Sequence, residues 1–183
     1  MRSLRLDPAV RGDLEALYAD GASALDERRY DDWIELFTED CEYVLQPREN
    51  FDRGLPLATM MLESKGMLRD RIHAIGDTLF HAPYYQRHLV GPLRIVRVAP
   101  AQVDVEVNYA VFRTRLHEPT ETFNVGRCLD TLVRGSDADS GGDAGHAGDR
   151  VRAEADHAHV WRIRSRRVVF DSELVLNSII YPI

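Results

Sequence analysis

The chain has 183 residues, of which 44% are hydrophobic and 29% charged, a composition typical of a single globular domain spanning residues 1–183. Its formal net charge of −7 argues against a general role in nucleic-acid binding, because phosphate recognition needs an excess of basic residues. No stretch approaches the roughly 20 apolar residues of a membrane helix. The N-terminus also lacks the apolar core of a signal peptide, so we expect a cytoplasmic protein that does not bind membranes.

Two helices are predicted near the N-terminus. The pair Asp7-Pro8 is typical of a helix start, with the aspartate as N-cap and the proline at the first helical position. An apolar stripe then recurs at spacings of three and four, formed by Leu14, Leu17, Tyr18, Gly21, Ala24 and Leu25. A shorter helix should follow, with Trp33 facing inward and Asp32 facing outward.

A short strand at Cys41–Pro47 is expected next, followed by a loop at Arg48–Leu57. The loop is predicted from its polar composition and from the glycine and proline within it. A third helix should then run from Leu57 to about Ile75, with Met60 and Met61 among its buried residues.

From Tyr84 onward the sequence period changes to two, which is typical of strands. Residues 103–111 alternate clearly, and the alternation slips at Val111-Phe112, which indicates a β-bulge. Another alternating run consists of Phe123, Val125, Arg127, Leu129, Thr131 and Val133. Two more strands are expected, around residues 159–163 and 167–176.

Residues 135–150 form a Gly/Asp-rich segment that we predict to be a mobile hairpin insertion, because it contains nothing apolar enough to bury. Two sets of side chains near it could be considered as metal ligands, although a solvated loop and strand end are the favoured interpretation. They are His146 with Asp139 and Asp143, and His157 with His159.

The predicted order of helices followed by long strands indicates an α+β fold, with N-terminal helices packed on a long, curved antiparallel sheet. Such a sheet wrapped around helices would leave a cone-shaped cavity. No phosphate-binding glycine loop or nucleophile elbow is present in the sequence. The two cysteines, Cys41 and Cys128, have no histidine at the spacing of a Rieske module, and we expect two buried thiols.

Several stretches, in order along most of the chain, resemble the small-subunit family of aromatic-ring-hydroxylating dioxygenases. They include Leu25–Trp33, Tyr43–Glu49 with its Pro-Arg-Glu ending, Arg87–Val90, Phe112–Leu116, Val125–Arg127 and Arg166–Asp171. The resemblance implies a nuclear-transport-factor-2-like (NTF2-like) cone. It also implies a structural small subunit without cofactor or catalytic residues of its own.

The same resemblance implies a large alpha subunit as partner, usually in an alpha3beta3 hexamer. The large subunit of this family carries a Rieske [2Fe-2S] cluster and a mononuclear Fe(II), and a ferredoxin or reductase supplies its electrons. Arginine is enriched at interfaces and the C-terminal residues are unusually apolar, so we predict a set of interface residues. They are Arg48, Glu49, Arg113, Arg115, Tyr181 and Ile183.

Two alternatives remain open. The chain could be a stand-alone dehydratase or isomerase of the same fold, in which Tyr18, Asp32 and His88 perform acid–base chemistry. It could also be a small-molecule binding module without chemistry.

Overall fold

The computed structural model of the protein describes residues 6–77, 83–135, 161–172 and 181–183. The helical half contains α1 (Pro8–Asp26), α2 (Tyr30–Glu35), β1 (Phe37–Pro47), α3 (Arg48–Asp52), β2 (Met60–Leu62) and α4 (Lys65–Asp77). The second half contains β3 (Tyr84–Val90), β4 (Arg94–Ala99), β5 (Gln102–Arg115), β6 (Glu121–Arg134) and β7 (Trp161–Phe170). The predicted insertion beyond Gly135 lies outside the described residues, as do the histidines at 146, 157 and 159.

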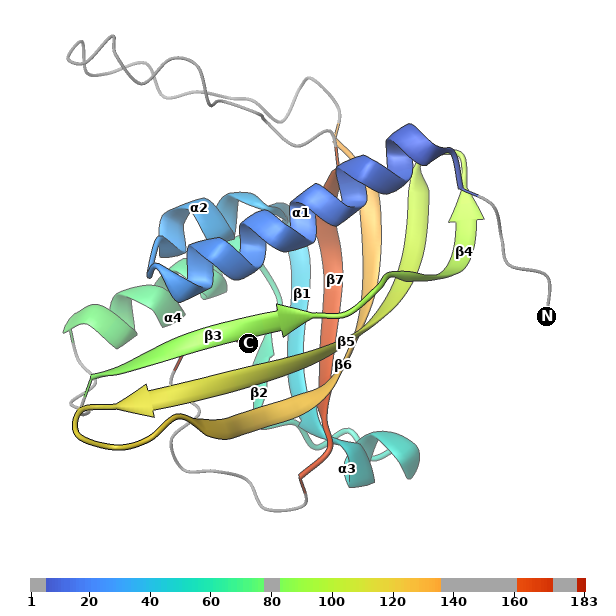
Figure 1. Cartoon of the computed structure of the whole chain (residues 1–183). Coiled ribbons are helices and arrows are strands. Elements are labelled where there is room, and N and C mark those ends of the chain that lie inside the picture. Colours follow the sequence, from blue (N-terminus) through green and yellow to red (C-terminus); the bar gives the residue numbers. More distant parts are fainter. Residues whose placement is uncertain (1–5, 78–82, 136–160, 173–180) are drawn as a thin grey trace, which may run out of the picture.

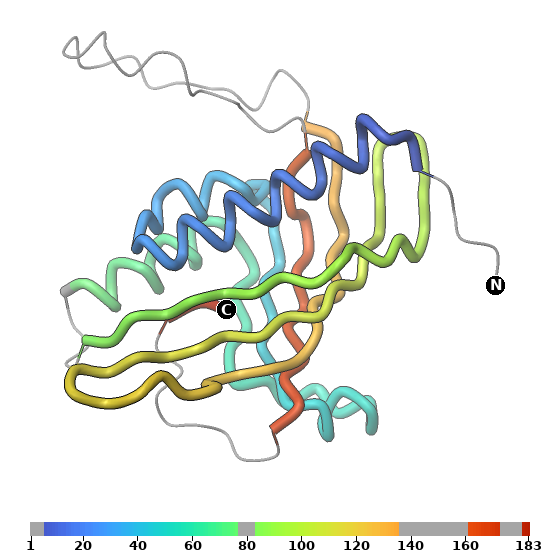
Figure 2. The backbone as a smooth tube through the Cα atoms, viewed as in Figure 1, coloured from blue at the N-terminus to red at the C-terminus, as the bar shows by residue number. Residues whose placement is uncertain are grey.

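The described strands form one seven-stranded sheet in the order β2-β1-β7-β6-β5-β3, with β4 also pairing with β5. The sheet curls around α1, and α2 and α4 lie on the same side as α1 (Figure 1). The tube in Figure 2 shows how β3, β5 and β6 sweep across the molecule beneath α1. This arrangement confirms the predicted α+β cone, with one refinement: β1 and β7 pair in parallel, whereas the other paired strands are antiparallel.

Helix α1 forms as the sequence predicts. The Asp7 side chain accepts a hydrogen bond of 2.8 Å from the Ala9 amide, and Pro8 begins the helix. The predicted apolar stripe is the face of α1 that is buried, and it joins the main core against the sheet. No helix in the described part of the chain is both long and apolar enough to cross a membrane.

Three predicted boundaries are wrong. The helix predicted at 57–75 begins at Lys65, where the Ser64 hydroxyl caps it by accepting a hydrogen bond of 3.2 Å from the Met67 amide. Met60 and Met61 lie instead on β2, paired with β1. The predicted loop after Pro47 opens with the short helix α3, and the two predicted C-terminal strands are a single described strand, β7.

The predicted β-bulge at Val111-Phe112 is confirmed, but the extra residue lies on the neighbouring strand. Val111 pairs with Asn124 and Phe112 with Thr122, so Phe123 of β6 has no partner in the register. Strand β5 therefore keeps its alternation through the bulge, and Arg113 follows Val111 into the interior.

The bulge also changes which residues of β6 face the core. Past the bulge, the buried side of β6 is even-numbered and consists of Asn124, Gly126, Cys128, Asp130 and Leu132. The odd-numbered run seen in the sequence is less buried from Val125 onward. The buried face was not recognised from the sequence because it carries Asn124, Gly126 and Asp130 in place of large apolar residues.

Gly126 is an inward position with no room for a Cβ atom. A Cβ atom there would overlap the Val169 carbonyl oxygen and lie 2.8 Å from the Phe170 Cα atom. Because these are backbone atoms of β7, they cannot swing aside as a side chain could.

We expect Gly126→Ala to lower the free energy of unfolding by about 3 kcal/mol or more, because it forces β6 and β7 apart. Gly12→Ala is the matched control, since a Cβ atom on this exposed residue of α1 meets nothing within 4 Å. It should raise stability by roughly 0.5–1 kcal/mol through helix propensity. Urea unfolding followed by circular dichroism measures both changes, and equal stability of the two variants would contradict the steric argument.

Candidate functional site

The concave face of the sheet holds a buried ionic cluster made by Asp130 of β6, Arg166 of β7 and Tyr18 of α1. Arg166 donates to Asp130 Oδ2 from Nε at 3.0 Å and from Nη2 at 2.8 Å. The Tyr18 hydroxyl donates to the same oxygen at 2.5 Å. The Asp130 side chain is 0% exposed and that of Arg166 is 9% exposed, so the pair is shielded from water.

Burial and charge act together on this cluster. Burial raises the pKa of Tyr18 well above its usual value, and the negative charge of Asp130 raises it further. For Arg166 burial alone would lower the pKa, but the adjacent Asp130 carboxylate outweighs it and the pKa is raised. The Arg166 guanidinium also lies 5.3 Å from the ring centroid of Tyr18, within cation–π range. The raised pKa values keep the Tyr18 phenol neutral and the Arg166 guanidinium charged near neutral pH.

A second polar pair joins the C-terminal end of α1 to β3. His88 Nδ1 lies 2.7 Å from Asp26 Oδ1, and the His88 amide donates to the same carboxylate at 3.0 Å. Arg87 also contacts Asp26, at 3.2 Å. The side chains of Asp26 and His88 are 4% and 5% exposed. Asp26 therefore fixes the imidazole through one ring nitrogen while the other is left for a different partner.

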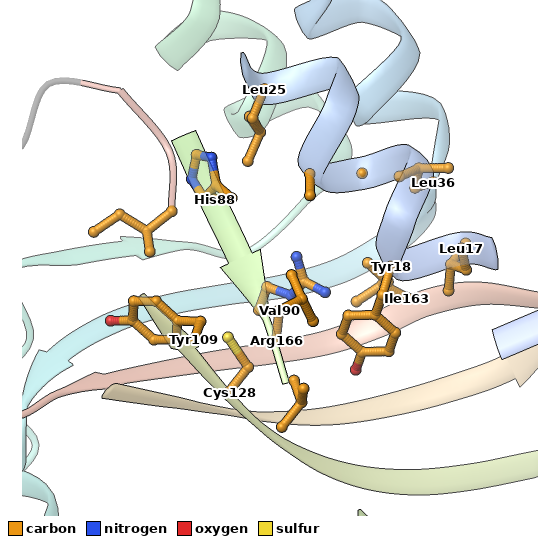
Figure 3. A pocket seen from close by; sticks show the side chains of 14 residues that line it. Leu17, Tyr18, Leu25, Leu36, His88, Val90, Tyr109, Cys128, Ile163 and Arg166 are labelled. Carbon is orange, nitrogen blue, oxygen red and sulfur yellow. The ribbon is translucent and has the colours of Figure 1, made fainter. Parts of the chain in front are cut away.

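A small cavity lies between α1 and the concave face (Figure 3). Leu17, Leu25 and Val90 form an apolar part of the cavity wall. Tyr18 and Arg166 of the ionic cluster, and His88 of the second polar pair, also line the cavity. Figure 3 shows Leu25 and His88 at one end of the cavity, with Tyr109 and Cys128 of the sheet facing them. The cavity has a volume of about 40 Å³, enough for roughly three or four water molecules at about 10–15 Å³ each.

The predicted acid–base group is only partly assembled. Tyr18 and His88 both line the cavity, but Asp32 does not accompany them. The Asp32 side chain is 62% exposed and pairs with Arg29 beside α2. Asp26 takes the place next to His88 that the sequence interpretation had given to Asp32. Asp32 lies instead in the solvated first turn of α2, where the positive end of the helix dipole stabilises a carboxylate.

The predicted interface residues fall into two groups. Arg48, Glu49 and Arg115 have side chains that are 55%, 45% and 39% exposed, and they remain available to a partner. Arg113, Tyr181 and Ile183 are buried within this chain. Arg113 stacks on the Phe123 ring, Tyr181 packs on Tyr84, and the Tyr43 hydroxyl donates to the Ile183 carbonyl oxygen at 3.1 Å.

Three polar residues of the site were missed from the sequence: Asp26, Asp130 and Arg166. Helical spacing could have found Asp26, because it lies two turns beyond Tyr18 on the same face of α1. Asp130 and Arg166 pair directly across β6 and β7. Recognising them would have required the register of two strands separated by more than 25 residues in sequence.

The two cysteines do not fit an iron–sulfur cluster. Cys41 lies in β1 and Cys128 in β6, on strands separated by β7. Burial raises the pKa of the Cys128 thiol to about 12 and that of Cys41 to about 11, so both stay protonated near neutral pH. Among the described residues, no group of three His, Cys, Asp or Glu side chains is arranged to hold a metal ion.

Comparison with known proteins gives consistent matches. Residues 20–140 match the family described as ring hydroxylating beta subunit. The chain is 30% identical over 159 residues to the anthranilate 1,2-dioxygenase small subunit of Burkholderia cepacia, covering 87% of this chain and 85% of that protein. It is 29% identical over 120 residues to a beta subunit of the terephthalate 1,2-dioxygenase terminal oxygenase component of a Comamonas species, covering 66% and 78%.

A solved structure from Novosphingobium aromaticivorans is similar throughout. It is described as the beta subunit of a dioxygenase assigned to the aromatic-ring-hydroxylating class. It superposes with a TM-score of 0.74 at 31% sequence identity, covering 96% of this chain and 97% of that one.

We expect Asp130→Asn to lower the free energy of unfolding by about 3–5 kcal/mol, because it leaves the Arg166 charge buried without a counter-ion. Asp32→Asn is the matched control, since it removes an exposed carboxylate paired with one arginine, and it should change stability by less than about 1 kcal/mol. Urea unfolding at neutral pH measures both. Similar losses of unfolding free energy in the two variants would show that the buried ion pair contributes no more to stability than the exposed one.

Proposed function

Because the chain belongs to the ring hydroxylating beta subunit family, we propose that it is the small subunit of a multicomponent aromatic-ring hydroxylase. The observation that carries this proposal is sequence similarity running through most of both chains in the comparison with the anthranilate dioxygenase small subunit. In this role the chain stabilises a larger catalytic subunit and performs no redox chemistry itself. The complex acts in the cytoplasm in the breakdown of aromatic compounds.

We assign the Rieske [2Fe-2S] cluster and the mononuclear Fe(II) to the partner alpha subunit, in an alpha3beta3 assembly that receives electrons from a ferredoxin or reductase. The cysteines of this chain support the assignment of both iron cofactors to the partner. A Rieske centre needs two cysteine thiolates and two histidines around one cluster, whereas Cys41 and Cys128 are separately buried as thiols.

The substrate of the assembled enzyme is proposed to be an aromatic carboxylate. Two relatives reported above are named for anthranilate and terephthalate, and both compounds are carboxylic acids on an aromatic ring.

A second candidate function is acid–base chemistry by this chain alone. It is favoured by the buried Asp26–His88 pair beside a cavity, an arrangement able to accept a proton from a bound molecule. Asp26 replaces Asp32 in this alternative, because Asp32 lies outside the cavity.

Co-expression with the large subunit of the same oxygenase tests the first proposal. We expect the two chains to co-purify, iron to be retained with the large subunit, and ring hydroxylation of aromatic carboxylates to require both chains. Full activity of the large subunit without this chain would overturn the structural role. Turnover by this chain alone that His88→Ala abolishes would instead favour the second candidate.

The exposed charges at α3 provide a sharper test of the partner surface. Figure 1 shows α3 at one extremity of the molecule, away from α1. Arg48 lies there beside Asp52 and Asp171, each at 3.4 Å. We expect Arg48→Glu to weaken assembly with the large subunit by about tenfold, because charge reversal at an interface is unfavourable.

Arg11→Glu on α1 is the control for charge alone, since Arg11 has a side chain that is 38% exposed and is paired with the carboxylate of Glu15. Its effect on assembly should be small. Analytical ultracentrifugation of the mixed subunits measures both. Equal weakening by the two variants would remove Arg48 from the interface.

A further inference from the structure

The cavity beside α1 adjoins a wider groove on the outside of the cone. The groove runs between α1 and the β3 region. It is largely open to solvent and has a volume of about 660 Å³. Tyr18, Ala22, His88 and Val90 line both the cavity and the groove. These four residues therefore separate a small enclosed space from an open one.

His88 has an unfilled hydrogen-bonding position at this boundary. Its Nδ1 atom is engaged by Asp26, but its Nε2 atom is buried and has no hydrogen-bond partner among the described residues. The side chain is 5% exposed, so bulk water does not satisfy that nitrogen. Buried polar atoms in folded proteins nearly always have a partner, which makes this nitrogen a candidate contact for a bound molecule.

The contact with Asp26 determines what Nε2 can do. An ionised carboxylate accepts hydrogen bonds and cannot donate them, so Nδ1 carries the proton in the 2.7 Å contact. When the ring carries this single proton, Nε2 presents a lone pair and acts as an acceptor. A ligand that matches it must donate a hydrogen bond.

The surrounding residues select an uncharged ligand. The two guanidinium groups nearby already neutralise carboxylates, Arg166 with Asp130 and Arg87 with Asp26. Neither is left as a counter-ion for an anion. The remaining wall is largely apolar, from Leu17, Leu25 and Val90.

We propose that the boundary between cavity and groove is a binding site for a small uncharged molecule that joins an apolar body to a hydroxyl group, such as a phenol. The hydroxyl donates to His88 Nε2, and the ring extends between Ala22 and Val90 into the groove. The 40 Å³ of the cavity is too small for a ring, so the ring occupies the groove side, which has a volume of about 660 Å³. This site is independent of the proposed subunit role, because it uses residues of this chain alone.

Titration of the full-length chain with phenol, followed by methyl resonances in NMR spectra, tests the proposal. Ala22 and Val90 should show saturable shifts, while the exposed Leu116 should not. Toluene has the same shape without the hydroxyl group and should bind about tenfold more weakly, since Nε2 then stays unpaired. Benzoate should also bind at least about tenfold more weakly, because an ionised carboxylate cannot donate to Nε2.

Two variants complete the test. His88→Phe keeps a ring of similar shape without the acceptor and should weaken phenol binding about tenfold, whereas His117→Asn, at an exposed histidine with φ of 63°, should leave it unchanged. Ala22→Leu fills the boundary and leaves His88 in place, so it should abolish the Val90 shifts even if His88→Phe disturbs folding. Phenol affinity equal to that of toluene, or undiminished in Ala22→Leu, would overturn the proposal.

Discussion

The buried pair of Asp130 and Arg166 is the constraint on which the interior of this protein depends. The two charges are buried and neutralise each other. Removing either one would leave an unpaired ion in an apolar core. Because the two residues face each other across β6 and β7, a slip of one residue in that register would turn Asp130 to the outer face. Tyr18 donates to the same carboxylate, so this contact also sets where α1 crosses the sheet.

Local patterns were sufficient for the elements whose inner face is apolar. The α1 stripe and the Val103–Val111 alternation both matched the buried faces observed. The pattern failed where the inner face is polar or has little side chain, as along β6 with Gly126, Cys128 and Asp130. It also failed at Met60 and Met61, because a short apolar run fits a strand as well as a helix, and pairing with β1 decides between them.

The site shows the same division between local and long-range information. Tyr18 and His88 were identified from the sequence as residues that such a fold brings near its cavity, and both line it. Their carboxylate partners were not identified. The contact of Asp130 with Tyr18 spans 112 positions in the sequence, and helical spacing places Asp26 near Tyr18 but does not reveal its contact with His88, which spans 62 positions. Arg113 was predicted to be exposed for a partner, but its guanidinium lies 4.3 Å from the Phe123 ring centroid because β5 keeps its phase through the bulge.

The central position of β7 has a consequence for how the chain folds. This last described strand lies between β1 and β6, so before it pairs the sheet consists of two pieces, β2-β1 and β6-β5-β3 with β4. The first piece lacks a partner for β1, and the second presents β6 as an unprotected edge open to wrong pairing. Contacts this distant in sequence form slowly, so the finished cone and any surface it offers to another subunit appear late, after residues 161–170 have been synthesised.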